Sequence, residues 1–396
     1  SRMSSREKIT FVPKENQPQV EPQQGVFTDS SLTPVEEAMV SSVLNWDHPE
    51  ALVPYIEEVF GRSFILRSPD QSSSLEAALL GEYDGLQVLG LGGVVQAVQG
   101  GLRFEKETLH ISPVDDQNHA DDLEAILQTS SIDKSGQVQL KTATYAPLHG
   151  MTAESAQRRR YHSQQLQGLV DTYRQAGKKP LFVLPQFVAE GQLTNKFDAE
   201  GNPLVFQVYR VPLVRRLPNQ IIESMYNDSY TAGMAKSVEA NYSIGRVLRG
   251  LHVCRYVYGD PHLGNMSHIE SQLGNTMYIT DLGNAKDIEN EQLAVQRKYL
   301  GLDLAITIYS QLELAKHLSV LFSRTDKDTF SITNLTITHL TALLGGYFVT
   351  ELSRQRLTHP ELIRLAEQLA LRLETQDVQQ LVDLLASVIE KYQVIK

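Results

Sequence analysis

Apolar residues recur along this chain at two spacings, and the change from one to the other divides the chain into two parts. Alternating or clustered apolar residues bounded by turn residues predict strands, and these runs come first. They cover residues 85–98, 136–142, 180–188 and 204–212. Beyond them, apolar residues three and four positions apart predict amphipathic helices, as at Ile244, Val247 and Leu251. The pattern therefore predicts a strand-rich first part and a helical second part.

The N-terminal region is expected to stand apart from these strands. Residues 1–30 are rich in Gln, Pro, Ser and Glu and show little periodicity, which is typical of a disordered arm. Helical spacing follows, with Val35, Met39 and Val43 on one side, and a second amphipathic segment comes after it. We therefore expect a helical extension over residues 31–75.

The composition is that of a folded, acidic protein. Of 396 residues, 41% are apolar, enough for a sizeable core, and no apolar run is long enough to predict a transmembrane segment. Cys254 is the single cysteine, which argues against a disulfide framework and favours a reducing compartment, the cytoplasm or, after secretion, the cytosol of a host cell. The net charge of -11 argues against nucleic-acid binding as the main activity.

Candidate chemistry concentrates in two loops that follow apolar runs. Asp260 and Asn265 lie five positions apart in a turn-rich loop, and Asp281 follows another apolar run 16 positions after Asn265. Carboxylate and carboxamide oxygens from two loops can meet at one site, and Mg²⁺ accepts such ligands together with substrate phosphates. The alternative is purely structural: Asp260 caps a turn and Asp281 ends an edge strand.

The run Asp-Pro-His-Leu-Gly-Asn at 260–265, followed by Asp-Leu-Gly at 281–283, resembles the catalytic and metal-binding loops of the protein-kinase-like superfamily. It is especially similar to aminoglycoside and choline phosphotransferases, to ubiquinone-biosynthesis atypical kinases and to some bacterial effector kinases. The resemblance implies an α+β, bilobal protein-kinase-like fold with a small β-rich N-lobe and a helical C-lobe. It also implies ATP and Mg²⁺ or Mn²⁺ as cofactors, Asp260 as a catalytic residue, and Asn265 and Asp281 as metal ligands.

Further positions resemble the phosphate-binding parts of this superfamily. Gly90, Gly92 and Gly93 resemble a glycine-rich phosphate loop, although valine stands where a third glycine is expected. Lys141 ends a predicted strand and resembles the lysine that contacts ATP phosphates. Lys106 is the competitor, and Lys141 is preferred because a predicted helix and then a new strand follow it.

The helix expected at about 153–175 should carry a glutamate that pairs with the lysine. Glu154 is its only glutamate and lies near its start, so it either pairs with Lys141 or is a first-turn carboxylate favoured by the helix dipole. The last predicted strand of the N-lobe contains Tyr209 and Val211. The resemblance places their backbone groups at the lobe hinge, beside the adenine edge of ATP.

Asp303 resembles the aspartate of a buried helix that braces the catalytic loop in kinases. It comes only 22 positions after Asp281, without an Ala-Pro-Glu-like ending between them. A phosphorylation-controlled activation segment is therefore not expected, which leaves regulation by a partner, by a small ligand, or none. Tyr258 is expected to be scaffolding, and His262 to orient the loop by hydrogen bonding.

We therefore predict a kinase N-lobe over 76–211 with an insertion at about 102–135, and a C-lobe over 212–396. The predicted function is ATP-dependent phosphorylation of Ser or Thr in a protein substrate by a kinase of the bacterial effector type. The alternatives are a small-molecule kinase of the aminoglycoside and choline phosphotransferase type, a pseudokinase scaffold, and a kinase fold that transfers AMP or an amino acid. The arginines at 158–160 and nearby lysines are either a solvated face or a site for a polyanionic activator such as an inositol phosphate.

Overall fold

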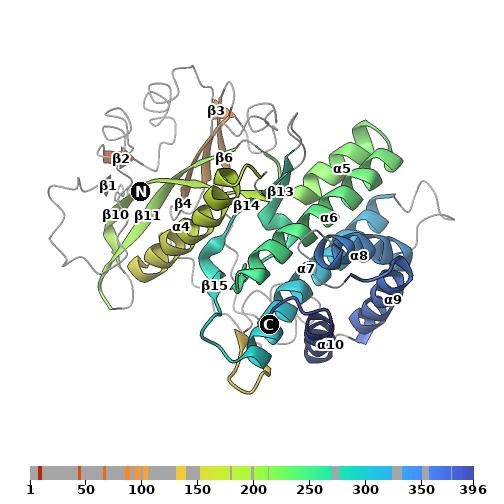
Figure 1. Ribbon diagram of the computed structural model, residues 1–396. Coiled ribbons are helices and arrows are strands. Elements are labelled where there is room, and N and C mark those ends of the chain that lie inside the picture. The colour runs from red at the N-terminus through yellow and green to blue at the C-terminus, as the bar shows by residue number, and fades with distance from the viewer. Residues whose placement is uncertain are drawn as a thin grey trace. The chain divides into compact units, whose positions relative to one another are not determined.

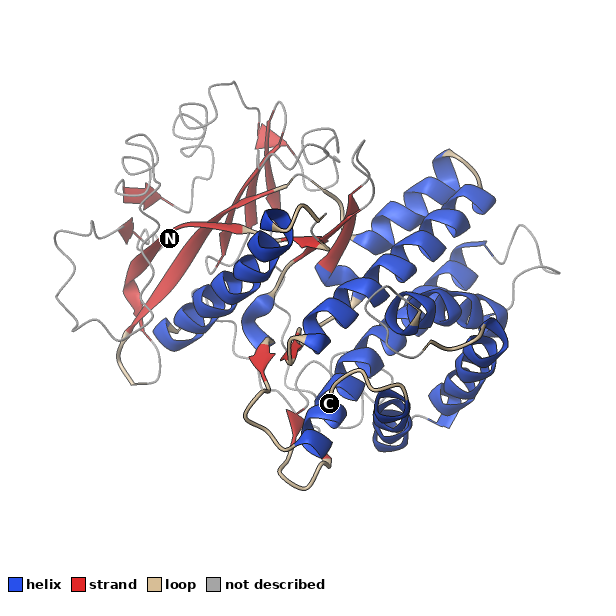
Figure 2. Ribbon diagram, viewed as in Figure 1, coloured by secondary structure: helices blue, strands red, loops and turns tan. Residues whose placement is uncertain are grey.

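The fold is that of a computed structural model, drawn in Figures 1 and 2. It describes residues 8–10, 43–45, 66–67, 85–89, 94–98, 101–105, 131–139, 152–178, 181–197, 200–212, 214–269, 276–322, 332–349, 356–375 and 377–396. This part of the chain is α+β and mostly helical, with several small sheets. The chain divides into unit 1, with Ser1–Ser112, Thr144–Asp171 and Leu184–Arg215, and unit 2, with Pro113–Ala143, Thr172–Val183 and Arg216–Lys396.

Unit 1 contains a five-stranded sheet in the order β2-β1-β10-β11-β4. Its strands are β1 (Lys8–Thr10), β2 (Val43–Asn45), β4 (Gly85–Leu89), β10 (Gln186–Phe197) and β11 (Pro203–Val211). All neighbouring strands are antiparallel, and the long hairpin of β10 and β11 stands out in Figure 1. Gly201 lies at the turn of this hairpin with a φ of +84°, a conformation that glycine adopts without strain.

A second sheet of unit 1 has the order β3-β6-β5. Its strands are β3 (Leu66–Arg67), β5 (Val94–Val98) and β6 (Gly101–Glu105). Helix α4 (Ala153–Gln175) begins in unit 1 and packs on the larger sheet. The side-chain amide of Gln207 in β11 donates to the carbonyl oxygen of Ala156 at 2.9 Å, and both residues are fully buried. A buried amide with a carbonyl partner fixes where α4 meets the sheet.

Several strands of unit 1 differ from what the sequence pattern predicted. Strand β2 covers Val43–Asn45, so the helix predicted there is wrong at these residues, and pairing with β1 supplies their backbone hydrogen bonds instead. Strand β1 lies within the segment expected to be disordered. The strands predicted over residues 85–98 are present as β4 and β5, and β4 pairs with β11 whereas β5 pairs with β6. The remainder of residues 1–75, apart from β3, lies outside the described residues.

Unit 2 holds the two candidate loops between short, paired strands. Strands β13 (Met266–Ile269), β14 (Thr276–Ile279) and β9 (Phe182–Val183) form one sheet in the order β13-β14-β9, and β12 (Tyr256–Val257) pairs with β15 (Lys286–Asp287). The Asp260 loop connects β12 to β13, and the Asp281 loop connects β14 to β15. Each loop therefore begins and ends on a hydrogen-bonded strand.

The rest of unit 2 is largely helical, as Figure 2 shows. Its helices are α5 (Leu217–Asn227), α6 (Tyr230–Val253), α7 (Leu293–Phe322), α8 (Ile332–Phe348), α9 (His359–Thr375) and α10 (Val378–Lys391). The predicted apolar face of α6 is confirmed, because Ile244, Leu248 and Leu251 are fully buried. Among the helices that the structure describes, none has the length and apolar character needed to cross a membrane.

A small hairpin of β7 (Ser131–Ile132) and β8 (Val138–Gln139) belongs to unit 2, not to the β-rich unit in which the sequence pattern placed it. The backbone amide of Val138 donates at 2.7 Å to the side chain of Gln379 in α10, 241 positions away. The Tyr299 hydroxyl of α7 donates at 3.0 Å to a carbonyl of β7. These long-range contacts hold the strand that precedes Lys141 against the helices of unit 2, and Lys141 itself lies outside the described residues.

Candidate active site

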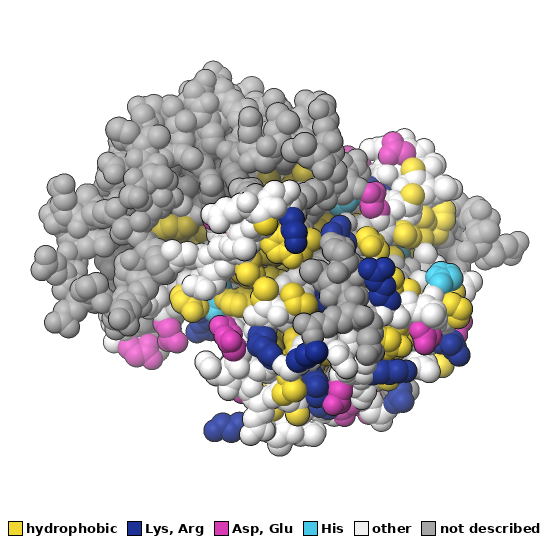
Figure 3. Space-filling view, viewed as in Figure 1, with side chains coloured by type: hydrophobic (Ala, Val, Ile, Leu, Met, Phe, Trp, Pro, Cys, Tyr) yellow, Lys and Arg dark blue, Asp and Glu magenta, His cyan; other side chains and the backbone are white. Residues whose placement is uncertain are grey.

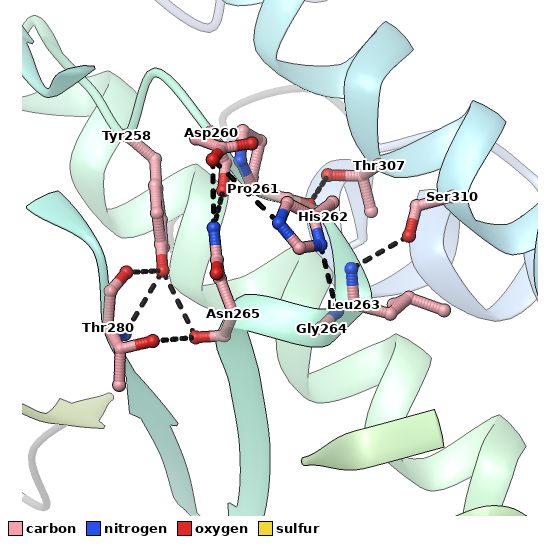
Figure 4. Close-up of polar contacts among 10 residues, drawn as sticks. All are labelled: Tyr258, Asp260, Pro261, His262, Leu263, Gly264, Asn265, Thr280, Thr307 and Ser310. Carbon is pink, nitrogen blue, oxygen red and sulfur yellow. Dashed lines mark hydrogen bonds and ion pairs between the residues drawn. The ribbon is translucent and has the colours of Figure 1, made fainter. Parts of the chain in front are cut away.

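The candidate catalytic loop leaves β12 and turns at Gly259. This glycine has a φ of +87°, in the left-handed region that other residues adopt only at a cost. A Cβ atom at this position would lie 1.9 Å from the carbonyl oxygen of Asn284, so a larger residue does not fit without a shift of the backbone. The turn places the next residue, Asp260, in the loop drawn in Figure 4, where it is buried.

The carboxylate of Asp303 in α7 fixes this turn. Its Oδ2 atom accepts the Tyr258 N–H at 2.8 Å, and its Oδ1 atom accepts the Gly259 N–H at 2.9 Å. The Nε2 atom of His252, near the end of α6, lies 2.9 Å from Oδ2 and supplies a third donor. A buried carboxylate is tolerated when its oxygens accept hydrogen bonds in this way. The prediction that Asp303 braces the loop containing Asp260 is confirmed.

Asp260 and Asn265 meet across the loop. The Nδ2 atom of Asn265 donates to the carbonyl oxygen and to Oδ2 of Asp260, each at 3.0 Å (Figure 4). Both hydrogens of the amide group therefore have acceptors, which sets its orientation and leaves Oδ1 as its acceptor atom. The loop thus presents a carboxylate beside a carboxamide oxygen.

Asp281 is brought to the same place by the strand that precedes it. Thr280 donates to the carbonyl oxygen of Asn265 twice, from its backbone N–H at 2.9 Å and from Oγ1 at 3.0 Å. Asp281 follows directly, with φ and ψ of 55° and 62°. A left-handed conformation costs a residue with a side chain about 1–2 kcal/mol, and such strain is concentrated at functional positions. The structure therefore joins the two loops one residue before Asp281.

Tyr258 ties the two loops together from the interior. Its ring is fully buried, and its hydroxyl donates to the Thr280 carbonyl oxygen and accepts the Thr280 N–H at 3.1 Å. Burial is the largest cause that raises the pKa of this phenol well above its usual value, and the charges of Asp260 and Asp281 raise it further. Both carboxylates therefore act on one buried hydroxyl, and the scaffolding role expected of Tyr258 is confirmed.

His262 orients the loop as a neutral imidazole. Burial lowers its pKa from 6.5 to about 4, against a smaller raising effect of Asp281. Its Nδ1 atom accepts the Gly264 N–H at 3.1 Å, so the ring proton lies on Nε2, which is 3.8 Å from Oδ2 of Asp260. The expected hydrogen-bonding role of His262 in the loop is confirmed.

Two hydroxyl groups of α7 also hold the candidate catalytic loop. The Thr307 hydroxyl donates to the Pro261 carbonyl oxygen at 2.8 Å, and the Ser310 hydroxyl accepts the Leu263 N–H at 2.8 Å (Figure 4). With Asp303, these residues recur three and four positions apart in the mostly apolar stretch 300–310 of the helix. Only Asp303 was predicted from the sequence. The same spacing could also have identified Thr307 and Ser310.

The segment after Asp281 returns quickly to the body of unit 2. A short 3-10 turn, Leu282–Asn284, leads into β15, which pairs with β12, and the Ile288 N–H then donates to the Arg255 carbonyl oxygen at 2.9 Å. Residues 276–322 are described without a gap, and α7 begins at Leu293. The segment between Asp281 and α7 is thus short and is tied back to β12, and its interpretation as a shortened activation segment stays a prediction.

The predicted nucleotide-binding residues are only partly described. Those that lie outside the described residues are Gly90, Gly92, Gly93 and Lys141. Tyr209 lies in β11 and is buried, with its hydroxyl donating to Oε1 of Gln207 at 2.6 Å. Val211 is the last residue of β11, and unit 2 resumes at Arg216. A contact between this strand end and adenine stays a prediction.

Helix α4 places Glu154 and the arginines at 158–160. Glu154 lies in the first turn and pairs with Arg158 at 3.4 Å, as a first-turn carboxylate does, and both side chains are exposed. The guanidinium of Arg160 lies 5.8 Å from the centre of the Phe187 ring. On the face drawn in Figure 3, basic side chains are interspersed with acidic and apolar ones. A polyanion site at these arginines stays a prediction.

The donor set of the two loops fits a magnesium ion. Asn265 and Asp281 offer a carboxamide and a carboxylate oxygen, and Mg²⁺ is usually bound by one or two such groups together with substrate phosphates. Within the part of the chain that the structure describes, no three His, Cys, Asp or Glu side chains form a metal cluster. A protein cage made of many carboxylates is thus not present there, and water molecules or the oxygens of a bound phosphate would complete the coordination.

Comparison with known proteins gives a likeness to solved structures. No protein-family model matches the chain, and no curated protein matches it. Among solved structures, it is similar to one described as WaaP in complex with acyl carrier protein, with a TM-score of 0.33 and 13% sequence identity. The match covers 55% of this chain and 76% of that chain.

Proposed function

We propose that this protein is a phosphotransferase of the kinase-like type, which moves the γ-phosphoryl group of ATP to a hydroxyl acceptor. The observation that supports this most directly is the joining of the two loops. The side-chain amide of Asn265 donates to Asp260. The backbone carbonyl oxygen of Asn265 accepts from Thr280, the residue directly before Asp281. This arrangement gathers an acid–base carboxylate and two oxygen ligands from loops that are separate in sequence.

Asp260 orients the acceptor hydroxyl and takes its proton late in the transfer. The acceptor oxygen forms a bond to the γ-phosphorus while the bond from that phosphorus to the bridging oxygen of ADP breaks, and the hydroxyl proton passes to Asp260. Phosphoryl transfer depends on positioning and charge stabilisation more than on a strong base. The hydrogen bond from Asn265 and the brace from Asp303 supply that positioning.

Asn265 and Asp281 would hold Mg²⁺ or Mn²⁺, which would neutralise charge on the transferring phosphates. Lys141 contacts the phosphates that do not react, and the backbone amides of Gly90, Gly92 and Gly93 approach them. Backbone groups of Tyr209 and Val211 bind the adenine edge. These nucleotide contacts are carried forward from the sequence resemblance.

Two classes of hydroxyl acceptor are compatible with this proposal. A Ser or Thr residue of a protein is the first candidate, as for a kinase of the bacterial effector type. A small hydroxyl compound is the second, and the short segment after Asp281 favours it. Residues 282–292 are confined between Asp281 and α7 and are tied back by β15, which leaves little chain there to form a platform for an extended peptide.

The reaction is tested with ATP labelled at the γ- or the α-phosphorus, in the presence of Mg²⁺ or Mn²⁺. Asp260→Asn should lower turnover about 10²–10⁴-fold, the usual contribution of a positioned acid–base group, while ATP still binds. Asp281→Asn should remove the metal-dependent part of ATP binding. Asp287→Asn, the same change at an exposed position of β15, is the matched control and should act as the wild type does.

The outcomes separate the alternatives. Transfer of the γ-label, or its release to water, supports the proposal, and transfer of the α-label indicates that AMP is moved instead. ATP binding without either product, in the wild-type protein and with both metals, would indicate a pseudokinase scaffold. Labelling of a generic protein or of the chain itself, compared with labelling of small hydroxyl compounds, decides between the two acceptor classes.

A further inference from the structure

A chain of three buried side chains leads from α8 to the catalytic loop. The Tyr347 hydroxyl lies 2.6 Å from Nδ1 of His252, and Nε2 of His252 lies 2.9 Å from Oδ2 of Asp303. Asp303 in turn accepts the backbone N–H groups of Tyr258 and Gly259. All three side chains are nearly or fully buried, so water does not replace these hydrogen bonds. The chain connects three helices, α8, α6 and α7, to the turn before the acid–base residue.

The donors and acceptors in this chain allow one arrangement of protons for a neutral histidine. The Asp303 carboxylate only accepts, so Nε2 of His252 must carry the ring proton. Nδ1 must then accept, and the hydrogen comes from the Tyr347 hydroxyl. Burial raises the pKa of Tyr347, which keeps the phenol protonated and able to donate. Without that hydroxyl, Nδ1 of His252 would lose its donor, and the ring would keep only the hydrogen bond to Asp303 to fix its orientation.

We propose that Tyr347 is a positioning residue for phosphotransfer: its hydroxyl donates to Nδ1 of His252 and fixes the orientation of the imidazole whose Nε2–H holds Asp303, and Asp303 holds the turn that aims Asp260. The catalytic consequence rests on the proposed function, whereas the effect on the order of the loop does not. Tyr347 acts through two intermediate side chains and makes no contact with the loop through its hydroxyl. Its role is therefore separable from that of a residue that touches substrate.

The Tyr347 ring is held independently of its hydroxyl. It packs edge-on against Phe348 with ring centres 4.8 Å apart, and the Arg249 guanidinium lies 5.6 Å from its centre. A side-chain nitrogen of Arg249 also donates to the Tyr347 carbonyl oxygen at 3.3 Å. Tyr347→Phe therefore removes the hydrogen bond and keeps the packing, so a change in the loop reports on the hydrogen bond to His252.

Another buried tyrosine provides a matched control. Tyr309 of α7 is also almost fully buried, and within the described part of the chain its hydroxyl has no hydrogen-bond partner. Tyr309→Phe is the same chemical change in the same helical body, without a link to His252. Its loop order and its turnover should remain those of the wild type.

Hydrogen exchange of the full-length protein, followed by mass spectrometry, measures the loop directly. The peptide that contains Tyr258 and Gly259 should exchange about tenfold faster in Tyr347→Phe, because their two amides lose a well-oriented acceptor. The same peptide should be unchanged in Tyr309→Phe. Equal exchange in the wild type and Tyr347→Phe would overturn the proposal.

A second background distinguishes the hydrogen bond to His252 from packing. In His252→Gln, the side-chain amide can donate to Asp303 without the imidazole that the Tyr347 hydroxyl orients, so adding Tyr347→Phe should speed loop exchange much less than it does with histidine present. An equal effect in both backgrounds would mean that Tyr347 acts by packing alone and would overturn the proposal. The comparison of the two tyrosine variants stands even where His252→Gln alters the fold.

Turnover gives the catalytic half of the inference. Tyr347→Phe should lower kcat for γ-phosphoryl transfer about tenfold and leave KM for ATP within about twofold, because the loop is misaligned and the nucleotide site is not. Faster loop exchange with unchanged kcat would overturn the positioning role. A wild-type protein that moves no phosphoryl group would overturn the proposed function, while the exchange results would still test the hydrogen-bonded chain.

Discussion

Gly259 carries two separate constraints, and they can be measured apart. It has a positive φ, and its missing Cβ leaves room for the Asn284 carbonyl oxygen. Gly177, also in unit 2, has a φ of +69° with nothing within 4 Å of the Cβ position, so it carries the first constraint alone. The pair separates backbone strain from close approach.

Gly259→Ala should destabilise unit 2 by several kcal/mol, of which about 1–2 kcal/mol is the left-handed conformation and the rest is the clash with Asn284. Gly177→Ala should lower the free energy of unfolding by only about 1–2 kcal/mol. Thermal or urea unfolding of both variants checks this. Equal losses would mean that the carbonyl of Asn284 moves aside at no cost.

His262 should make stability depend on pH. Its pKa falls from 6.5 in an unfolded chain to about 4 on burial, so the unfolded state binds more protons between these values. The contribution of neutral His262, on the order of 1–3 kcal/mol, is present in full above pH 6.5 and is lost as pH falls towards 4. Buried His339 shifts in the same direction and adds to the loss.

The measurement is the difference in Tm between the wild type and His262→Asn across this range. Asparagine can still accept the Gly264 N–H, so the difference should be largest near neutral pH and should shrink as pH falls. His317→Asn, at an exposed position of α7, controls for the change of side chain. A difference that stays constant with pH would contradict the assignment.

At the scale of elements, α6 and α8 pack through glycines that let two backbones come together. A Cβ on Gly245 would lie 2.2 Å from the Leu343 carbonyl oxygen, and one on Gly346 would lie 2.0 Å from the Tyr242 carbonyl oxygen. The neighbouring Gly345 would meet only a Tyr242 ring carbon, at an ordinary 3.8 Å. Two adjacent glycines of one helix therefore differ in whether the crossing needs them.

Gly346→Ala should destabilise the protein by at least about 1–3 kcal/mol, because overpacking forces the helices apart. Gly345→Ala should stabilise it by up to about 1 kcal/mol, because alanine favours the helix and its methyl group has room. Urea unfolding of both variants gives the comparison. Since α8 carries Tyr347, we also expect Gly346→Ala to loosen the catalytic loop.

At the scale of the whole molecule, the hairpin of β7 and β8 shows how distant segments are assembled within unit 2. It is held by Tyr299 of α7 and Gln379 of α10, and Tyr299 also accepts from Lys286 of β15 at 3.0 Å. One phenol thus touches both the hairpin and the segment that follows Asp281. The segment just before Lys141 is anchored to the same body as the two active-site loops.

Tyr299→Phe should release the hairpin, because the donor to Ile132 is lost at a cost of about 1 kcal/mol. Limited proteolysis should then cut within residues 131–139 faster than in the wild type. Tyr309→Phe, the same change farther along α7, should leave the cleavage rate as it is. Unchanged cleavage in Tyr299→Phe would mean that Gln379 alone holds the hairpin.

The sequence by itself was sufficient to predict structural features that depend on local sequence patterns. Helical spacing identified the buried face of α6, and the order of Asp260, Asn265, Asp281 and Asp303 indicated residues that the fold brings together or uses as braces. The face of α6 depends on residues a few positions apart, where spacing alone decides which side chains share a face. The four polar positions were indicated by their resemblance to the loops of the protein-kinase-like superfamily.

Only the tertiary structure decided the features that depend on distant partners. Val43–Asn45 is a strand because β1 pairs with it, and the strand before Lys141 joins unit 2 because Gln379 is there to accept its amide. His252 and Tyr347 stand 95 positions apart, and neither is marked by a local pattern as a partner of the other. A hydrogen bond between such residues exists only once packing has brought them within reach, so no spacing along the chain encodes it.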